Sequence, residues 1–203
     1  MNQEILDNAS PAALRNAPFI ADALEDYISE QETILEIASG TGYHIFFLAA
    51  RYPKIYWQPS EQDENSYNIV EDLSRRFTQT NLHPPLCIHS EEKNWINKDI
   101  DAILCCNMIH ISPISSTYGL FEGAKRYLSP NQYLFLYGPF KIDGKHTSES
   151  NKVFDESLKA KNNSWGVRDI ADLKKIGKAN QMSLLKKMQL PANNSVLIFT
   201  KVT

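Results

Sequence analysis

The residues best suited to chemistry form one short stretch, where the apolar run Thr33–Ile37 leads into Ala38-Ser-Gly-Thr-Gly42. Gly40 and Gly42 permit positive φ angles and let a ligand approach bare backbone. Glu36 lies inside the same turn, and its fixed carboxylate would oppose a phosphate dianion. The stretch therefore predicts a site for a ligand that carries positive charge.

Two familiar phosphate-binding motifs are missing from this loop. Tyr43, His44 and Ile45 follow Gly42 without the third glycine of the dinucleotide fingerprint, and the Gly-Lys-Ser/Thr of a P-loop is absent. S-adenosylmethionine fits these constraints, because it carries a sulfonium and an ammonium group. The alternative is an ordinary strand-to-helix turn.

Three acids, Glu61, Asp63 and Glu64, come directly after the second apolar run and about twenty residues after the glycine loop. Ligands of open α/β sheets bind outside the carboxyl ends of the strands, where an acid after the second strand can bind both ribose hydroxyls. Glu61 is the best candidate for this role. Asp63 and Glu64 better fit the start of a solvated helix, since acids favour a helix N-terminus.

Further candidates follow the later apolar runs. Ser90 or Glu91 could bind an adenine amine, or could lie in a plain loop. Asn107 and His110 stand out as polar residues on an apolar segment, and His110 could act as a general base or as a hydrogen-bonded structural residue. Tyr137 follows the fifth run and could line a substrate pocket. Lys141, His146 and Arg168 would give that pocket positive character, or would belong to a solvated loop.

The elements that must position these residues alternate between short apolar strands and helices. This pattern predicts βαβ units and a mostly parallel sheet with helices on both faces. We expect helices at 2–30, 41–51, 63–77, 116–128, 151–161 and 167–181, and strands at 33–37, 55–58, 85–89, 100–106, 133–137, 183–190 and 195–202. The last two strands flank Pro191-Ala-Asn-Asn194 and predict a terminal antiparallel hairpin.

Length and composition fit one globular domain of 203 residues, with a helical cap at 1–30 and a polar insertion or lid at 141–164. The net charge of −3 and the scattered Lys and Arg give no strong nucleic-acid signal. Three cysteines in apolar runs show no metal-ligand spacing, and no signal peptide or membrane-spanning run is present. These features predict a cytoplasmic protein without a metal site or membrane partner.

With these residues in hand, the chain resembles the methyltransferase-like proteins catalogued as a domain of unknown function and typified by methyltransferase-like protein 26. The matching segments span nearly the whole chain. They are Ser10–Asn16, Leu35–Gly42, Trp57–Ser60, Asn107–Pro113, Gly119–Ala124, Leu136–Phe140, Asp143–Thr147, Ser150-Asn151, Phe154-Asp155, Trp165–Asp169 and Met188–Asn194. Ala38 replaces the first loop glycine of many class I enzymes, but Ala-Ser-Gly-Thr-Gly is usual in this family.

The resemblance implies a Rossmann-like class I methyltransferase with a seven-stranded sheet, and S-adenosylmethionine as its cofactor. It implies no particular substrate, and we expect a small molecule. Carried over by position, the cofactor residues are Glu36, Ala38, Ser39, Gly40, Gly42, Glu61, Ser90, Glu91 and Asn107. The substrate side is expected to include Arg15, Asn16, His146, Arg168, Asn193 and Asn194, with His110 and Tyr137 as catalytic candidates.

Methyl transfer by in-line displacement depends mainly on orientation, which can lower a barrier by roughly 7–11 kcal/mol. The lack of an obvious catalytic dyad therefore does not contradict this interpretation. Two alternatives remain open: a binding module that kept the fold without catalysis, and a nicotinamide-dependent oxidoreductase on a related sheet. The missing third glycine and the acidic loop disfavour the oxidoreductase.

Overall fold

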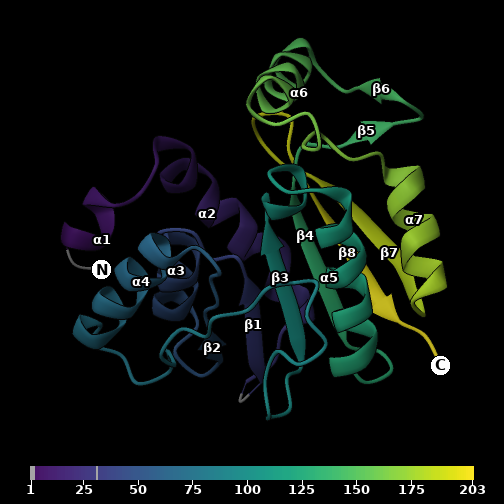
Figure 1. Cartoon of the computed structure of the whole chain (residues 1–203). Coiled ribbons are helices and arrows are strands. Elements are labelled where there is room, and N and C mark those ends of the chain that lie inside the picture. The colour runs from purple at the N-terminus through teal and green to yellow at the C-terminus, as the bar shows by residue number, and fades with distance from the viewer. Residues whose placement is uncertain (1–2, 31) are drawn as a thin grey trace.

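The computed structural model describes residues 3–30 and 32–203, and it is built around a six-stranded sheet of order β2-β1-β3-β4-β8-β7 (Figure 1). Its first four members run parallel: β2 (Tyr56–Gln58), β1 (Thr33–Ile37), β3 (Ala102–Cys106) and β4 (Tyr133–Gly138). The hairpin of β7 (Met182–Gln189) and β8 (Ser195–Lys201) completes the sheet, with β8 antiparallel to β4. The predicted α/β class and the terminal hairpin are confirmed.

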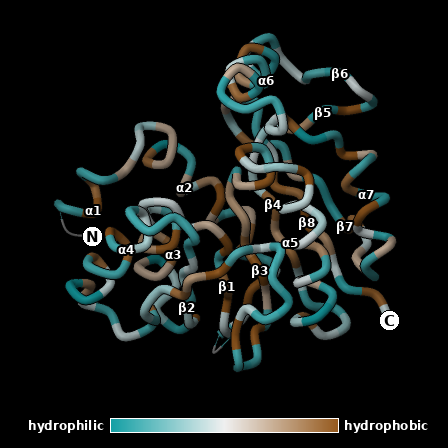
Figure 2. The backbone as a smooth tube through the Cα atoms, viewed as in Figure 1, coloured by the Kyte–Doolittle hydropathy of each residue, from teal (hydrophilic) through white to brown (hydrophobic). Residues whose placement is uncertain are grey.

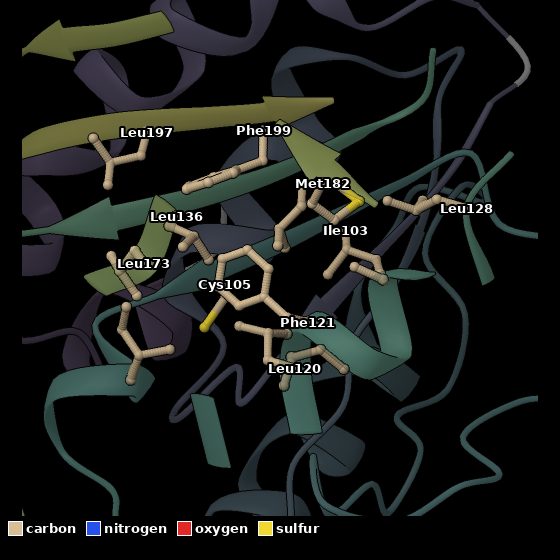
Figure 3. Close-up of a cluster of buried hydrophobic side chains, with 14 of the residues drawn as sticks. Ile103, Cys105, Leu120, Phe121, Leu128, Leu136, Leu173, Met182, Leu197 and Phe199 are labelled. Atoms are coloured by element: carbon tan, nitrogen blue, oxygen red, sulfur yellow. The ribbon is translucent and has the colours of Figure 1, made fainter. Parts of the chain in front are cut away.

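Helices cover both faces of the sheet. One face packs against α2 (Pro11–Leu24) and α3 (Tyr43–Arg51), and the other packs against α5 (Ile114–Tyr127) and α7 (Ile170–Ala179). Figure 3 shows the second of these cores, in which Leu120 and Phe121 of α5 meet Leu197 and Phe199 of β8. Buried runs on both faces explain the continuous apolar strands that the sequence shows.

The remaining elements lie at the ends and edges. They are α1 (Gln3–Asp7), the 3₁₀ turns η1 (Glu25–Tyr27) and η2 (Met108–His110), α4 (Glu64–Arg76), the small hairpin β5 (Lys141–Ile142) and β6 (Lys145–His146), and α6 (Glu149–Lys161). Figure 2 shows the hydrophobic residues along the central strands and the polar ones around the outer helices.

Side-chain caps explain where several helices begin. Ser10 accepts a hydrogen bond from the Ala13 amide, with Pro11 as the first residue of α2, so the predicted Ser-Pro helix start is confirmed. Asp63, Ser148 and Asp169 cap α4, α6 and α7 in the same manner. The predicted helix at 2–30 is divided into α1, α2 and η1, and residues 1, 2 and 31 lie outside the described residues.

The expected strand at 85–89 is wrong, and the sheet has six strands rather than seven. Residues 82–90 are irregular backbone that runs alongside β2. They pair with β2 and the residues after it only through two isolated bridges, Trp57 to Leu82 and Ser60 to Leu86. Pro84 and Pro85 remove two amide donors from this segment, so it cannot form a regular ladder. The polar segment at 141–164 contains the β5–β6 hairpin and α6, above the carboxyl ends of β3 and β4 in Figure 1.

Candidate functional site

The carboxyl ends of three neighbouring strands place Glu36, Cys106 and Tyr137 on one face of the sheet. Side chains alternate along a strand, so Glu36 shares the face of Ile34, Cys106 that of Leu104, and Tyr137 that of Phe135. Those apolar partners belong to the core under α2 and α3. The polar groups therefore extend this core into a site at the edge of the sheet.

The loop after β1 has the backbone that its small residues predict. Ala38, Gly40 and Gly42 all have positive φ angles, of 59°, 59° and 85°. Ser39 donates its amide to the Ser60 carbonyl at 2.8 Å, which ties the loop to the end of β2. A side chain at Gly42 would also meet the Phe46 ring at 2.6 Å, so glycine is required there by space as well as by conformation.

A cavity of about 180 Å³ lies between this loop, the first turn of α2, the first turn of α3 and the end of β3. It brings together five of the predicted cofactor residues. Its lining consists of Ser10, Ala13, Glu36, Ala38, Ser39, Gly40, Thr41, Tyr43, His44, Cys106 and Asn107. Gly42 shapes the next turn of the loop behind this lining. Larger hollows of about 320 and 400 Å³ lie elsewhere on the molecule.

Glu36 is the most unusual group in the cavity wall, because its residue is 1% exposed. Within residues 3–30 and 32–203, neither of its carboxylate oxygens has a hydrogen-bond partner. Burial raises the pKa of this carboxyl from 4.5 to about 7, and Ser39 and Cys106 beside it oppose the rise only in part. A buried acid without a partner is costly unless a ligand supplies a donor or a positive charge.

Glu61 is the acid of the 61–64 group that contacts the loop. Its Oε2 accepts the Gly40 amide at 2.7 Å, and its Oε1 accepts the amides of Gln62 and Asp63 at 2.8 and 3.1 Å. Asp63 instead caps α4, and Glu64 is exposed in the first turn of that helix. The carboxylate of Glu61 is therefore fixed beside the loop, where the ribose role predicted for it stays a prediction.

Ser90 and Glu91 lie outside the cavity lining. Ser90 is buried, and a side chain on Gly119 of α5 would meet its carbonyl at 2.4 Å. Glu91 accepts hydrogen bonds from Ser115 and Ser116, both at 3.0 Å, at the start of α5. The adenine contacts predicted for these two residues stay predictions.

His110 is enclosed by protein and does not line the cavity. It is 0% exposed, its Nδ1 accepts the Arg168 amide at 3.2 Å, and its carbonyl accepts the Gly166 amide at 2.9 Å. Burial lowers its pKa to about 3. This environment matches the structural role that the sequence left open, and the general-base role predicted for His110 stays a prediction. Asn107, in contrast, lines the cavity with a φ of 63° and donates its amide to the Tyr137 carbonyl at 2.8 Å.

Tyr137 lies beside the predicted substrate residues of α2 and of the β7–β8 turn. Its buried hydroxyl accepts a hydrogen bond from Asn194 Nδ2 at 2.8 Å. Burial raises the pKa of Tyr137, while Asn194, Arg15 and Asn16 oppose that rise and so lie close to the phenol. The structure thus brings Asn16, Tyr137 and Asn194 together, while Arg15 is exposed and acts on the phenol through its charge; their roles in binding or catalysis stay predictions.

His146, Arg168 and Asn193 are instead engaged by the polar insertion. The buried Asp155 carboxylate pairs with three basic side chains: Lys141 at 2.9 Å, His146 at 3.1 Å and Lys159 at 2.7 Å. It also accepts the Val167 amide at 2.7 Å. The positive character expected of Lys141 and His146 is therefore partly cancelled by Asp155.

The other two substrate candidates are held by neighbouring backbone and side chains. Arg168 donates to the carbonyls of Ile109 and Ser112 at 2.7 and 2.6 Å, which ties η2 to the segment that follows the insertion. The Asn193 carbonyl accepts from Asn151 of α6 at 2.9 Å. Neither Arg168 nor Asn193 lines the cavity next to Glu36.

Sequence reasoning missed His44 and Cys106 as members of the cavity wall. The apolar run that contains Cys106 predicts a buried strand residue, and His44 enters the sequence argument only as one of the residues that follow Gly42. The signal that could have found His44 is its place in the first turn of a helix that follows a ligand-binding loop. Among the described residues, no cluster of His, Cys, Asp and Glu can hold a metal ion.

The chain has the α/β fold of solved methyltransferases. It matches an O-methyltransferase family protein from Burkholderia thailandensis with a TM-score of 0.78, over 95% of this chain and 58% of that one, at 11% identity. Mitomycin 7-O-methyltransferase MmcR gives 0.78 at 12% identity, over 94% and 54% of the two chains. CalO1, a methyltransferase in calicheamicin biosynthesis solved with SAH bound, gives 0.75 at 11%, also over 94% and 54%.

The chain itself belongs to the family described as "Protein of unknown function (DUF938)", whose model matches residues 7–201. The predicted domain-of-unknown-function membership is thereby confirmed, while the narrower resemblance to methyltransferase-like protein 26 stays a prediction. The chain spans little more than half the length of the three solved methyltransferases. In the part of the chain that the structure describes, no helix is long and apolar enough to cross a membrane.

Proposed function

We propose that this protein is an S-adenosylmethionine-dependent methyltransferase that acts on a small molecule. One observation carries the proposal: Glu36 lines the glycine-loop cavity, and its buried carboxylate has no hydrogen-bond partner among the described residues. An ammonium group is the natural complement of such a carboxylate. The shared fold with solved O-methyltransferases, one of them with SAH bound, supports the same ligand class.

The residues present fit this cofactor. Glu36 would bind the amino group of its methionine end, the backbone of Ala38–Gly40 would pack against it, and the fixed carboxylate of Glu61 would bind the ribose hydroxyls. When bound, the cofactor supplies an activated methyl group on a positively charged sulfur. The task left to the chain is to orient the acceptor and exclude water, and orientation can be worth roughly 7–11 kcal/mol.

Calorimetric titration tests the binding half of the proposal. We expect S-adenosylhomocysteine to bind the wild type and NAD not to bind. Glu36→Gln should weaken S-adenosylhomocysteine by roughly 10- to 150-fold, since hydrogen bonds to charged groups are worth about 1.5–3 kcal/mol. Glu64→Gln, a change in an exposed acid of α4, is the matched control and should leave the affinity unchanged. Binding of NAD in place of S-adenosylhomocysteine would contradict the proposal.

Turnover separates an enzyme from a non-catalytic binding module. Protein, tritiated S-adenosylmethionine and a small-molecule extract of the source cells are incubated together, and label is followed into chromatographic fractions. We expect label in at least one small-molecule fraction, and roughly 10- to 150-fold less with Glu36→Gln at a cofactor concentration below the wild-type Kd. Binding without transfer to any fraction would favour the module.

A further inference from the structure

His44 is the second residue of α3, and its ring forms part of the cavity wall together with Glu36, Cys106 and Asn107. Its ring centroid lies 6.3 Å from that of Tyr137, so it stands between the glycine loop and the end of β4. Tyr137 in turn lies beside Asn16 and Asn194. His44 therefore occupies the boundary between the two groups of polar residues at this edge of the sheet.

The imidazole of His44 has unused hydrogen-bonding capacity. Its Nδ1 is buried and has no partner within the described part of the chain. Burial lowers the pKa of His44 to about 4, and a helix N-terminus disfavours the charged ring in the same direction. The ring is therefore neutral near pH 7, and a neutral imidazole offers one nitrogen lone pair as an acceptor.

The other polar groups of this edge are less suited to accept a proton. The Tyr137 hydroxyl is paired with Asn194, and burial raises the pKa of the Cys106 thiol well above its usual range. His110 has its Nδ1 occupied by the Arg168 amide and lies outside the cavity wall. Glu36 is the partner expected for the cofactor. His44 thus combines a place in the cavity wall with a buried ring nitrogen that has no hydrogen-bond partner among the described residues.

We propose that His44 contacts the methyl acceptor, which is a hydroxyl or amine compound, and takes its proton during transfer. This inference rests on the proposed function. A lone pair of the acceptor O or N forms the new bond to the methyl carbon, while the old C–S bond breaks and its electron pair stays on sulfur. The proton lost by the acceptor O–H or N–H goes to the free ring nitrogen, which leaves a methyl ether or methylamine and an imidazolium.

A weak base is sufficient for this step. As the acceptor oxygen or nitrogen bonds to the methyl carbon it becomes positively charged, and its remaining proton becomes far more acidic than in the free compound. A neutral imidazole within hydrogen-bond reach can then remove it. The charge that sulfur loses in the same step also leaves the site better able to hold an imidazolium.

The position of His44 can be tested without knowing the acceptor. The protein is labelled with ¹⁵N,¹³C-histidine, the His44 ring signals are assigned with His44→Gln, and S-adenosylhomocysteine and S-adenosylmethionine are added in turn. The two ligands differ only in the methyl group and the charge on sulfur. We expect the His44 ring signals to differ between the two complexes and those of His83, which stacks on Tyr56, to coincide. Identical His44 signals in the two complexes would overturn the proposal.

The proton-accepting role is tested with the tritium-transfer assay at saturating cofactor. We expect His44→Gln and His44→Ala to slow label transfer by roughly 10²- to 10⁴-fold, and added imidazole to rescue His44→Ala in part. Their affinity for S-adenosylhomocysteine should stay within about threefold of the wild type, while His83→Gln serves as the matched control for a histidine change.

Each other result has a definite meaning. Transfer at the wild-type rate by His44→Ala overturns the role of His44 but leaves the methyltransferase standing. A tenfold or greater loss of S-adenosylhomocysteine affinity in His44→Gln would make His44 a cofactor ligand and would also overturn it. Wild-type binding without any transfer counts against His44 as a proton acceptor. Absence of S-adenosylhomocysteine binding by the wild type refutes the proposed function itself.

Discussion

The buried carboxyl of Glu36 destabilises the ligand-free fold at neutral pH. Its pKa is raised from 4.5 to about 7, so the folded protein prefers the protonated acid. The folded state therefore binds this proton more tightly than the unfolded chain, and the unfolding free energy falls as the pH rises from about 4.5 to 7. A raised carboxyl pKa without a cationic partner is the pattern expected of a binding residue.

Glu36→Gln should stabilise the ligand-free protein at pH 8 by up to about 3 kcal/mol, because glutamine carries no charge to bury. At pH 4 the acid is already protonated, so the variant and the wild type should be nearly equal. Urea unfolding at the two pH values measures the difference. A gain of the same size at both pH values would show that the charge of Glu36 is not its cause.

The affinity for S-adenosylhomocysteine should depend on pH through the same carboxyl. An ammonium group binds the carboxylate and not the neutral acid, so the affinity should fall as the pH drops below about 7 and level off above it. Calorimetry between pH 5.5 and 8.5 follows this change. Glu36→Gln should bind weakly with a flat profile, and a sloping profile in that variant would assign the dependence to another group.

At the scale of elements, buried polar contacts hold the polar insertion (141–164) against the elements around the candidate site. Asp155 of α6, with its side chain 3% exposed, pairs with Lys141 of β5 and His146 of β6 and accepts the Val167 amide. Asn151 of the same helix donates to the Asn193 carbonyl in the turn whose next residue holds Tyr137. The insertion expected at 141–164 is thus fixed by buried polar contacts to the elements it covers.

Asp155→Ala should lower the unfolding free energy by about 1–3 kcal/mol, since it leaves the partly buried Lys141 and His146 and the Val167 amide without their partner. The pKa of Asp155 is lowered in the fold, so its contribution should be present at neutral pH and be lost as the pH falls below about 4. Urea unfolding at pH 7 measures the loss. Asp172→Ala removes an exposed ion pair with Lys175 and should lower the unfolding free energy by less than about 1 kcal/mol. Equal losses in the two variants would show that the buried contacts of Asp155 add no stability.

The N-terminal helices act as a cover over the cavity. The lining includes Ser10 and Ala13, and Thr41 Oγ1 donates to the Asn8 carbonyl at 2.8 Å. The cavity volume of about 180 Å³ is below the roughly 300–1,000 Å³ of ligand pockets. If the proposed nucleoside cofactor binds here, we expect this cover to move outward when it enters.

Thr41→Val removes the hydrogen bond to Asn8 and should make opening easier by about 1 kcal/mol. We expect S-adenosylhomocysteine to associate and dissociate roughly fivefold faster, which stopped-flow mixing can measure. Thr80→Val, a change in an exposed threonine beyond α4, is the control and should leave both rates alone. Unchanged rates in Thr41→Val would indicate that the cofactor enters by another route.

At the scale of the whole molecule, the elements that could be predicted are those that local pattern specifies. Apolar runs predicted β1, β3, β4 and β8, and Ser10-Pro11 predicted the start of α2. The segment at 85–89 has the apolar residues of a strand, but whether it pairs depends on the edge strand β2 and on two prolines. The two prolines are visible in the sequence and argue against a regular strand there, whereas pairing with β2 depends on tertiary contacts that no local pattern contains.

The residues of the cavity wall also divide into those that local sequence predicts and those that tertiary packing decides. Glu36, Ala38 and Gly40 were predictable because a glycine loop after a strand has few other uses. His110 looked reactive in the sequence and proved to be enclosed, while His44 lay unremarked two residues beyond Gly42. Which of two histidines reaches a cavity depends on how α3, η2 and the insertion pack, and that packing joins segments far apart in the chain.

Because the cavity is bordered by α2, α3, β1 and β3, ligand binding should stabilise the whole fold. At a hundredfold excess over its Kd, S-adenosylhomocysteine should add about 2.7 kcal/mol to the unfolding free energy. For a chain of this size that corresponds to a rise in Tm of roughly 5–10 °C, measured by differential scanning calorimetry. NAD at the same concentration should give no rise. A rise with NAD and none with S-adenosylhomocysteine would show that the glycine loop binds a dinucleotide in spite of its buried acid.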